Sequence, residues 1–448
     1  MTPGTGPSSI QDVTDEWPAI AEIIETITLR AGHNTNMVIA GTTLLGLAAG
    51  LIGVFALLRN RSLMTDALSH ATLPGITLAF LILGAKSLPV LLLGATITGV
   101  LGVLCIQLLL RHTRLREDAS IGIVLSVFFG AGIVGLSYIQ VNAPSGSGGL
   151  NHFIYGQAAT MQPRDVVLMG AIALAAMIAT IFLLKEFTIV CFNDAFARVD
   201  GWPVGLIDLL MMALVVVVTV AGLQAVGLIL VVSLLIIPPV AARFWTDRLP
   251  RLVIIAALIG ACSGYTGSVV SALFPRKPAG AVIVLTAGVF FAISMFFAPR
   301  RGVIAITIRR QKLRMKIAGD HLLEFAHDLG ETMISRDQYL GFAKLHAWSK
   351  TYTAMVGFSL ARDGMIERVN QGGITLTDAG VRRGNRVSRN HALWEQYLVS
   401  YADIAPSHVD WSVDLVEHVL SEDLVLELES ALRKRGVVIP EHTIVGGR

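Results

Sequence analysis

Charged residues are scarce in this sequence. Asp, Glu, Lys and Arg make up 15% of its 448 residues, against about 25% in soluble globular proteins, and this shortage excludes an ordinary soluble enzyme. The formal net charge of +3 is too small for a protein that coats nucleic acid. Cysteine is rare too, and Cys105, Cys191 and Cys262 lie far apart with no CxxC pair. The sequence therefore indicates neither a disulfide framework nor a thiolate metal site.

Apolar runs of about 20 residues recur through the first two-thirds of the chain, and each could cross a hydrocarbon layer about 30 Å thick. They predict an all-α polytopic membrane protein. We expect spans near residues 36–58, 65–84, 88–110, 119–139, 166–184, 206–225, 226–242, 252–272 and 280–298. The paired prolines of QAVGLILVVSLLIIPPVAARF leave open whether residues 226–242 form a broken or half-crossing helix. The predicted number of spans is therefore eight or nine.

Lys and Arg are concentrated in alternate loops, those that follow the first, third, fifth, seventh and ninth spans. These residues are Arg59, Arg61, Arg111, Arg114, Arg116, Lys185, Arg198, Arg243, Arg248, Arg251, Arg300 and Arg301. Because positively charged loops stay in the cytoplasm, we expect these loops and the C-terminal tail to be cytoplasmic. The chain would then be a multi-pass protein of the cell (inner) membrane, with residues 140–165 facing outward.

The composition divides the chain into three predicted parts. Residues 1–35 contain IAEIIETITLR, which predicts an interfacial amphipathic helix, and they lack the basic stretch that begins a signal peptide. Residues 36–302 contain the predicted spans. The rest of the chain is charged and helix-periodic, and its length suits a water-soluble domain. We predict this domain at residues 318–432.

The string RNRSLMTDALSHATLPG places two ionisable residues inside a predicted span. Asp66 and His70 are four residues apart, so they share one face of a helix. A carboxylate beside an imidazole suits a first-row divalent metal such as Mn, Fe or Zn, and ionisable residues inside a span are usually functional. The alternative is that the two residues cap or pair helices near the cytoplasmic interface.

A polar insert, KEFTIVCFNDAFARVDGWPVG, separates two predicted spans on the cytoplasmic side. It is typical of a short helix that lies across the inner surface, where an ATPase subunit could dock. An ordinary connecting loop is the alternative.

These strings, together with EDASIGIVLSVFFGAGI and PAGAVIVLTAGVFFAISMFFAPRRG, resemble permeases of the manganese/zinc/iron ABC importers, in the family's order across residues 36–302. The resemblance implies a homo- or heterodimeric permease that receives metal from an extracytoplasmic metal-binding protein. The Asp and His of the family's DALSHA motif are associated with the cation path and correspond to Asp66 and His70. The FNDAFARVDG segment corresponds to the region that docks on the ATPase, and it contains Asp194, Arg198 and Gly201.

The chain has no Walker A loop. We therefore expect ATP to be hydrolysed by separate ABC ATPase subunits, and the chain itself to be a transporter subunit rather than an enzyme. The transported ion is expected to be Mn²⁺, with Zn²⁺ or Fe²⁺ as alternatives, because such mixed ligands do not discriminate strongly among these metals.

The tail has a separate set of candidate ligands for a divalent metal. They fall into three groups at one-turn spacing, namely His321 with Glu324, His391 with Glu395, and Asp414 with Glu417 and His418. Each group shares one helical face, and mixed nitrogen and oxygen ligands favour Mn, Fe or Zn over Ca. A solvated helix face is the alternative for any single group.

Between these groups, the sequence predicts a helix, a turn, a second helix and a hairpin in which MIERV and ITLT flank NQGG. This pattern is typical of a winged helix-turn-helix. Residues 318–432 resemble the diphtheria-toxin-repressor family of iron- and manganese-dependent regulators. The resemblance implies a regulatory Mn²⁺, Zn²⁺ or Fe²⁺ bound by the residues of the three groups, although at His321 the family often has an acidic residue or Met.

Two active roles for the tail stay open, and a vestigial scaffold is the remaining alternative. The first is a regulatory module that senses cytoplasmic metal and tunes transport or permease dimerisation. The second is a membrane-tethered or proteolytically released repressor that binds DNA, which the few positive charges in residues 350–362 disfavour. An exporter or proton-driven carrier is a third class of function, and it would need neither an ATPase nor a binding protein.

Overall fold

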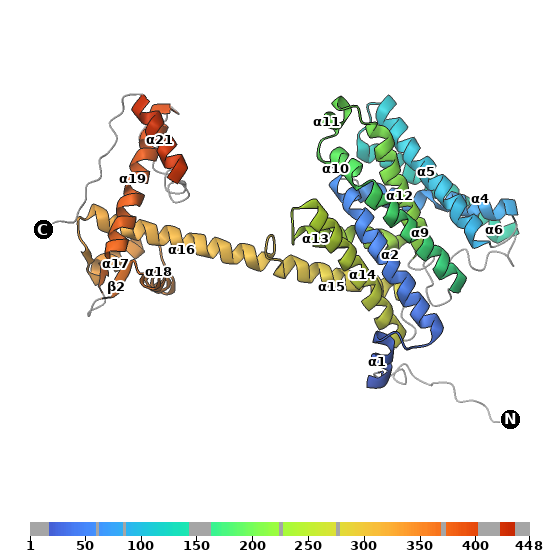
Figure 1. Ribbon diagram of the computed structural model, residues 1–448, viewed down its shortest axis with the longest axis horizontal. Coiled ribbons are helices and arrows are strands. Elements are labelled where there is room, and N and C mark those ends of the chain that lie inside the picture. Colours follow the sequence, from blue (N-terminus) through green and yellow to red (C-terminus); the bar gives the residue numbers. More distant parts are fainter. Residues whose placement is uncertain are drawn as a thin grey trace. The chain divides into compact units, whose positions relative to one another are not determined.

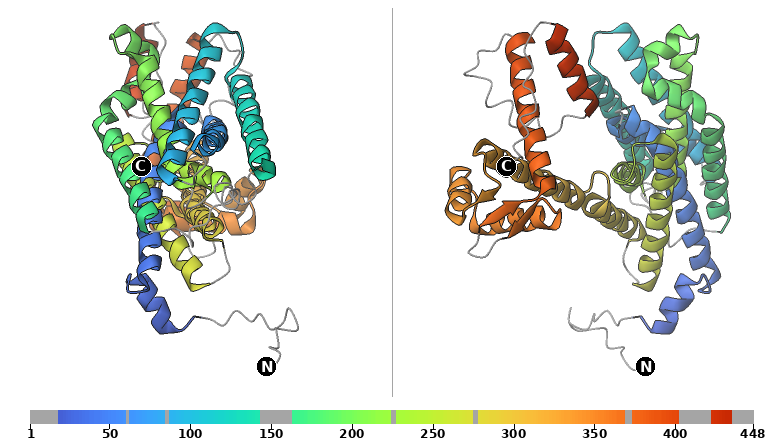
Figure 2. Two further views of the ribbon diagram at one scale, coloured as in Figure 1. Left: turned by 90° about the vertical axis from the view of Figure 1, so that its right-hand side faces the viewer. Right: turned by 60° about the vertical axis from the view of Figure 1, so that its left-hand side comes forward.

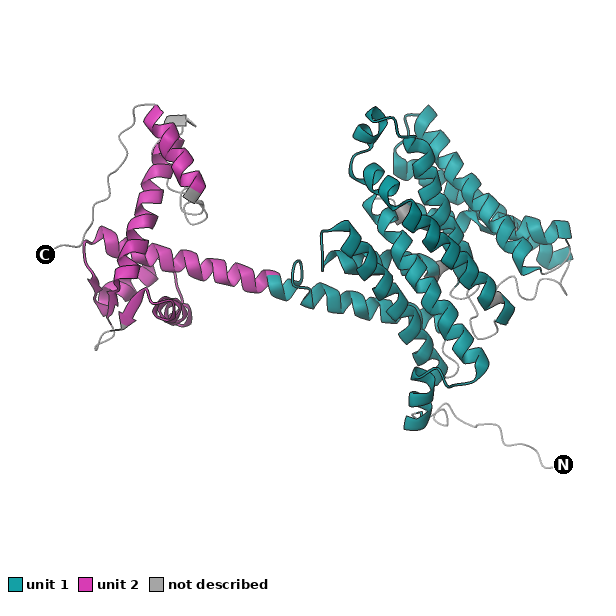
Figure 3. Ribbon diagram, in the orientation of Figure 1, with its two compact units in different colours: residues 1–305 teal, residues 306–448 magenta. Residues whose placement is uncertain are grey.

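The computed structural model describes residues 18–59, 62–83, 87–142, 163–223, 227–274, 278–368, 373–401 and 422–434. The chain forms two compact units, unit 1 with residues 1–305 and unit 2 with residues 306–448 (Figure 3). The described residues of unit 1 form helices and their connections, whereas unit 2 combines helices with one small sheet.

Helices α1 to α15 belong to unit 1 (Figure 1). They are α1 (Ile20–Ile27), α2 (His33–Leu58), α3 (Ser62–Ala71), α4 (Leu73–Leu83), α5 (Leu88–His112), α6 (Glu117–Asn142), α9 (Pro163–Phe182), α10 (Leu184–Phe192), α11 (Asp194–Val199), α12 (Val204–Leu223), α13 (Leu228–Arg243), α14 (Leu249–Leu273) and α15 (Ala279–Phe297). The helix α1 falls inside the segment for which the sequence predicts a lead-in helix.

Seven helical stretches in the described residues are long and apolar enough to cross a membrane, namely α2, α5, α6, α12, α14, α15 and the stretch Met64–Leu83 formed by α3 and α4. The bent pair of α9 and α10, with 64° between its halves, makes an eighth if it is one span. The seventh predicted span, residues 226–242, corresponds to α13, which has 16 residues and contains Pro238 and Pro239. At 1.5 Å per residue it is about 24 Å long, shorter than the hydrocarbon layer, as the half-crossing alternative requires.

The long helix α2 packs against α9, α12, α13 and α14 (Figures 1 and 2). Its contact with α14 is unusually close. A Cβ atom added at Gly46 would lie 2.2 Å from the carbonyl oxygen of Gly260, and one added at Gly50 would lie 2.2 Å from that of Ala256. Small residues let two helix backbones approach where lipid gives no hydrophobic drive for association. The glycines of α2 and α14 therefore set the spacing of this helix pair.

Unit 2 begins within α16 and continues through a small sheet and four further described helices. The elements are α16 (Val303–Asp328), β1 (Met333–Ile334), α17 (Arg336–Leu345), α18 (Lys350–Arg362), β2 (Ile366–Arg368), β3 (Ile374–Leu376), α19 (Asp378–Tyr401) and α21 (Glu422–Lys434). The sheet is antiparallel with the order β1-β3-β2, and its register pairs Met333 with Thr375 and Arg368 with Ile374. Figure 2 shows these helices and strands in gold (α16) through orange to red.

The winged helix-turn-helix predicted from the sequence is confirmed, and its helices begin at side-chain caps. Ser335 accepts a hydrogen bond from the backbone of Gln338, whose side chain accepts one from the backbone of Ser335, so α17 begins with a capping box. Ser349 caps α18 in the same way through the backbone N–H of Tyr352. β2 and β3 form the wing, and residues 369–372 of the predicted turn lie outside the described residues.

Candidate functional site

The structure brings together the predicted pair in the candidate span Met64–Leu83. His70 Nε2 lies 3.7 Å from Asp66 Oδ1, one turn apart on α3. The imidazole of His70 meets the ring of Phe129 from α6 edge to face, with 4.9 Å between the ring centroids. His70 Nδ1 is buried and has no hydrogen-bond partner among the described residues. A neutral imidazole next to a carboxylate can bind a divalent metal.

The short helix α11 lies in the polar insert between α10 and α12. Asn193 caps it by accepting a hydrogen bond from the backbone N–H of Phe196, and Arg198 pairs with Asp194 at 3.5 Å. Gly201 ends the segment with φ +85°, a conformation that favours glycine. The side chains of Phe196 and Val199 are 60% and 90% exposed. A short helix that presents two apolar side chains is suited to a protein partner.

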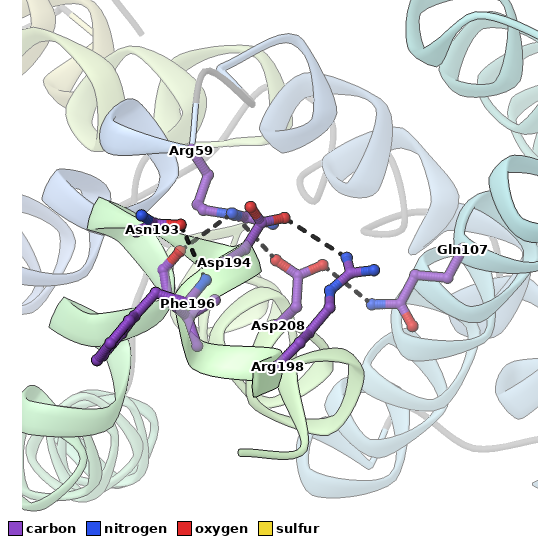
Figure 4. A network of polar contacts seen from close by, with 8 residues as sticks. Arg59, Gln107, Asn193, Asp194, Phe196, Arg198 and Asp208 are labelled. Atoms are coloured by element: carbon purple, nitrogen blue, oxygen red, sulfur yellow. Dashed lines mark hydrogen bonds and ion pairs between the residues drawn. The ribbon is translucent and has the colours of Figure 1, made fainter. Parts of the chain in front are cut away.

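A buried ion pair lies next to α11 (Figure 4). Arg59 Nε is 3.2 Å from Asp208 Oδ1, and the two side chains are 16% and 8% exposed. Gln107 Nε2 donates to Asp208 Oδ2 at 3.4 Å, and an Arg59 guanidinium N–H donates to the carbonyl oxygen of Val190 at 3.2 Å. This network joins α5, α12, α10 and the end of α2. It borders a hollow of about 560 Å³ that Arg198 of α11 also lines.

In unit 2, the structure brings together two candidate ligands from separate segments. Glu324 Oε1 on α16 lies 3.4 Å from His391 Nδ1 on α19, and both side chains are largely buried. Glu395 is one turn farther along α19 and half-buried. The ring of His321 lies 6.0 Å from that of His346.

The remaining predicted ligands, Asp414, Glu417 and His418, lie outside the described residues. Within the described part of the chain, no group of three or more His, Cys, Asp or Glu side chains is close enough together to hold a metal ion. The described part of the candidate site is therefore the pair formed by Glu324 and His391.

Two ion pairs hold α19 in place near Glu324 and His391. Arg383 Nε and Nη2 donate to the two carboxylate oxygens of Asp320 at 2.9 and 2.8 Å, which joins α19 to α16. These hydrogen bonds raise the pKa of Arg383 above its ordinary value. Farther along α19, Arg389 donates to Glu429 of α21. Because Asp320 and Glu324 are one turn apart on α16, the Asp320–Arg383 pair fixes the side of α19 that meets Glu324.

Comparison with known proteins assigns the membrane part of the chain. Residues 33–298 match the ABC 3 transport family. The chain belongs to this family. Residues 377–437 of this ABC 3 permease match the metal binding and dimerisation domain of the iron dependent repressors. Both resemblances stated from the sequence are confirmed.

Relatives of this ABC 3 permease differ in how much of it they cover. The manganese transport system membrane protein MntC of Bacillus subtilis is 38% identical over 86% of this chain and 88% of its own length. The zinc transport system membrane protein TroC of Treponema pallidum is 44% identical over 64% of this chain and 96% of its own length. The match to the Bacillus protein spans 384 residues, which exceeds unit 1, so it includes part of the tail.

A solved structure is similar to this chain over part of its length. The PsaBC structure from Streptococcus pneumoniae, in complex with Fab, covers 64% of this chain and 100% of the matched chain, with a TM-score of 0.57 and 32% identity.

Sequence reasoning missed the residues that position the candidate sites. Asp208 gave a usable signal, because it is an ionisable residue inside the apolar run LIDLLMMALVVVV. No sequence signal indicates Asp320, Arg383 or Arg389, because charged residues are common in the tail and their pairing depends on how α16 and α19 pack. The role of each candidate metal residue stays a prediction.

Proposed function

We propose that this ABC 3 permease is the membrane subunit of an importer for a divalent transition metal, with Mn²⁺ as the preferred substrate and Zn²⁺ or Fe²⁺ as alternatives. The manganese and zinc transport functions of the relatives support this substrate class. The observation that carries the proposal is the Asp66–His70 pair in the span Met64–Leu83. This pair offers carboxylate oxygen and imidazole nitrogen, which are the ligands that first-row divalent metals accept.

We propose that transport depends on partners. Separate ABC ATPase subunits would dock on α11 and hydrolyse ATP, an extracytoplasmic binding protein would deliver the metal, and a second permease subunit would complete the path. Asp194, Arg198 and Gly201 shape the docking segment, and the exposed Phe196 and Val199 supply its apolar contact. The Arg59–Asp208 pair would pass movement of α11 to α2 and α12, because rigid polar networks transmit small displacements between packed elements.

We propose that unit 2 is cytoplasmic and senses metal. Glu324 and His391 are two of its ligands, and Glu395, Asp414, Glu417, His418 and His321 are the further candidates. The support is that a carboxylate and an imidazole from different elements meet at 3.4 Å, so metal binding would tie α19 to α16. The bound metal would neutralise the carboxylates and hold the two helices together. Cytoplasmic metal could thereby tune transport or permease dimerisation.

The winged helix favours a second candidate function, that of a membrane-tethered or proteolytically released repressor. The exposed middle of α18, the helix that would enter the major groove, presents Met355 and Phe358, and its basic residues stand at the ends, Lys350 and Arg362. DNA-binding helices usually direct several basic and polar side chains toward phosphates and base edges. Regulation of transport is therefore the proposal that we favour.

The test is ATP-dependent uptake of Mn²⁺, Zn²⁺ and Fe²⁺ into vesicles that contain the chain with its ATPase and binding-protein partners. Asp66→Asn should abolish uptake and leave assembly with the ATPase intact, because the amide cannot supply a charged oxygen ligand. Asp118→Asn is the matched control, since Asp118 is an exposed carboxylate at the start of α6, and it should transport normally. Unchanged uptake by Asp66→Asn would remove Asp66 from the mechanism, and uptake without ATP would exclude an ABC importer.

A further inference from the structure

One face of unit 2 combines basic and apolar side chains and has no role in the proposed metal sites. Its α16 residues share one side of the helix by their spacing, and its α18 residues do the same. We call this set the basic–apolar face, and its members are Ile308, Arg309, Lys312, Leu313, Met315 and Lys316 of α16 with Met355, Phe358 and Arg362 of α18. Met355 and Phe358 are 52% and 62% exposed, and Ile308 and Leu313 are 49% and 45% exposed.

The two helices of this face are held together and enclose a hollow. The Tyr352 hydroxyl donates to the carbonyl oxygen of Arg314 at 3.1 Å, which joins α18 to α16. Burial raises the pKa of the Tyr352 hydroxyl above its ordinary value. The hollow has a volume of about 610 Å³, and residues of the face that line it are Lys312, Met315, Lys316, Phe358 and Arg362.

The charge around this hollow is positive. Its two carboxylates already have partners, since Asp320 accepts from Arg383 and Asp363 accepts from Arg362. Lys312 and Lys316 add two positive charges to these two pairs. An occupant of the hollow would therefore be anionic, with an apolar part that meets Met315 and Phe358.

The same positive charge extends along the chain toward the membrane. Residues 300–319 contain seven Lys and Arg residues and no Asp or Glu. The segment follows α15 directly, and α16 begins at Val303. At 1.5 Å per residue, Lys316 is about 20 Å from the start of the helix. A run of four to eight basic residues next to a membrane span attracts the anionic lipids of the cytoplasmic leaflet.

We propose that the basic–apolar face docks on the anionic phospholipid headgroups of the inner leaflet. Its Lys and Arg residues pair with the phosphates, and Met355 and Phe358 enter the boundary between headgroups and acyl chains, as amphipathic helices do at membrane surfaces. The proposal rests on the cytoplasmic placement of unit 2 proposed above. A DNA duplex would match the charges but not the exposed apolar side chains. Docking would constrain α16, the helix that also carries Glu324.

The test uses the full-length chain in nanodiscs, without metal or ATPase. Cys105, Cys191 and Cys262 are replaced by Ser, and Met355→Cys carries a fluorophore whose emission reports polarity. Emission should shift to the blue when phosphatidylglycerol is added to phosphatidylcholine discs, and about 1 M salt should reverse the shift because it shortens the Debye length to about 3 Å. Because a nanodisc exposes both leaflets, the result does not depend on the orientation of unit 2 in cells.

Charge variants decide whether this face is responsible. Combining Lys312→Gln, Lys316→Gln and Arg362→Gln should weaken docking on the order of 100-fold, since each basic residue near an anionic surface contributes about fivefold. The matched control combines Arg336→Gln, Lys344→Gln and Arg433→Gln, three exposed residues off the face, and should keep the shift.

Equal emission in both lipid mixtures, or a shift that survives the first triple variant, would overturn the proposal. A shift caused by duplex DNA in phosphatidylcholine discs would also overturn it, in favour of the repressor. Metal uptake is measured separately, so failure of docking and failure of the proposed transport are distinguishable.

Discussion

At the scale of single residues, the charged side chains that matter most here are those whose partners come from other helices. Glu324 and His391 meet because Asp320 and Arg383 join the same two helices one turn away. Asp208 is tolerated in an apolar helix because Arg59 and Gln107 meet both of its oxygens. In both places an ion pair holds the geometry on which a proposed function depends.

The sensor proposal predicts a loss of metal affinity when Glu324 changes. Glu324→Gln keeps the shape of the side chain but removes its charge, so Mn²⁺ affinity of the tail should fall by about 10-fold or more. The measurement is calorimetric titration of the detergent-solubilised chain with Mn²⁺. His327→Gln, on the same helix and paired with Asp328, should bind as the unchanged protein does. Equal affinities for the two variants would remove Glu324 from the ligand set.

The buried position of Asp208 predicts a stability effect. Asp208→Asn leaves the guanidinium of Arg59 without its counter-charge in a largely buried place, which should destabilise unit 1 by about 3 kcal/mol. Asp247→Asn is the control, because Asp247 pairs with Arg300 in an exposed position, and such pairs contribute about 0–1 kcal/mol. Melting temperatures of the two variants in the same detergent provide the comparison. If Asp247→Asn lowers the melting temperature as much as Asp208→Asn does, burial of the Arg59–Asp208 pair is unimportant.

At the scale of secondary-structure elements, glycine positions set how closely α2 and α14 can pack. Gly46→Ala would place its methyl group within 2.2 Å of the carbonyl oxygen of Gly260. The helices must then separate, which should destabilise the chain by about 1–3 kcal/mol. Gly130→Ala in α6 meets no atom within 4 Å, and it should be neutral or slightly stabilising, since Ala is the better helix former. Thermal unfolding of both variants checks this prediction, and equal melting temperatures would contradict it.

The element α11 predicts an effect on coupling rather than on folding. Arg198→Ala removes an exposed pair with Asp194, which contributes less than about 1 kcal/mol, so the fold should persist. Loss of the guanidinium from the hollow that it shares with Arg59 and Asp208 should nevertheless reduce stimulation of the ATPase by the permease. Arg114→Ala, an exposed arginine in the loop before α6, is the control. If the Arg198→Ala variant stimulates the ATPase and transports metal normally, residues 193–201 are an ordinary connecting loop rather than a docking segment.

At the scale of the whole molecule, a transport unit and a regulator unit share one polypeptide through α16. Five residues separate this helix from the end of α15, and it carries Asp320 and Glu324 at its other end. The proposed metal that joins α19 to α16 would therefore act on the element that connects the two units. We expect the effect of metal on unit 2 to be measurable in the intact chain.

The corresponding prediction is that Mn²⁺ stabilises unit 2. Binding to the folded form contributes RT ln(1 + [L]/Kd), about 2.7 kcal/mol at a hundredfold excess over Kd. Limited proteolysis of α19 in the full-length chain should therefore slow by about 100-fold, provided that cleavage follows transient opening. Glu417→Ala combined with His418→Ala should erase the protection without changing proteolysis in the absence of metal. If Mn²⁺, Zn²⁺ and Fe²⁺ all leave the rate unchanged, unit 2 is a scaffold rather than a sensor.

The sequence by itself determined the class of protein and most of its elements. A chain in lipid must satisfy its backbone hydrogen bonds within each span and present apolar side chains, so composition and run length indicate helices directly. The winged helix could likewise be predicted from local signals, such as the capping serines Ser335 and Ser349 and the hairpin. The one-turn spacing of Asp66 and His70 is also local, and it placed them on one face before any packing was known.

Only the tertiary structure decided which distant side chains meet. Nothing near Asp208 in the sequence indicates Arg59 or Gln107, and nothing near Glu324 indicates His391, because these contacts depend on how whole helices pack. The sequence left residues 226–242 open between a full and a half-crossing helix for a related reason, since apolar composition does not distinguish a full crossing from the short α13. Hydropathy and periodicity are properties of one segment, whereas an ion pair between helices is a property of two surfaces, and only their packing specifies it.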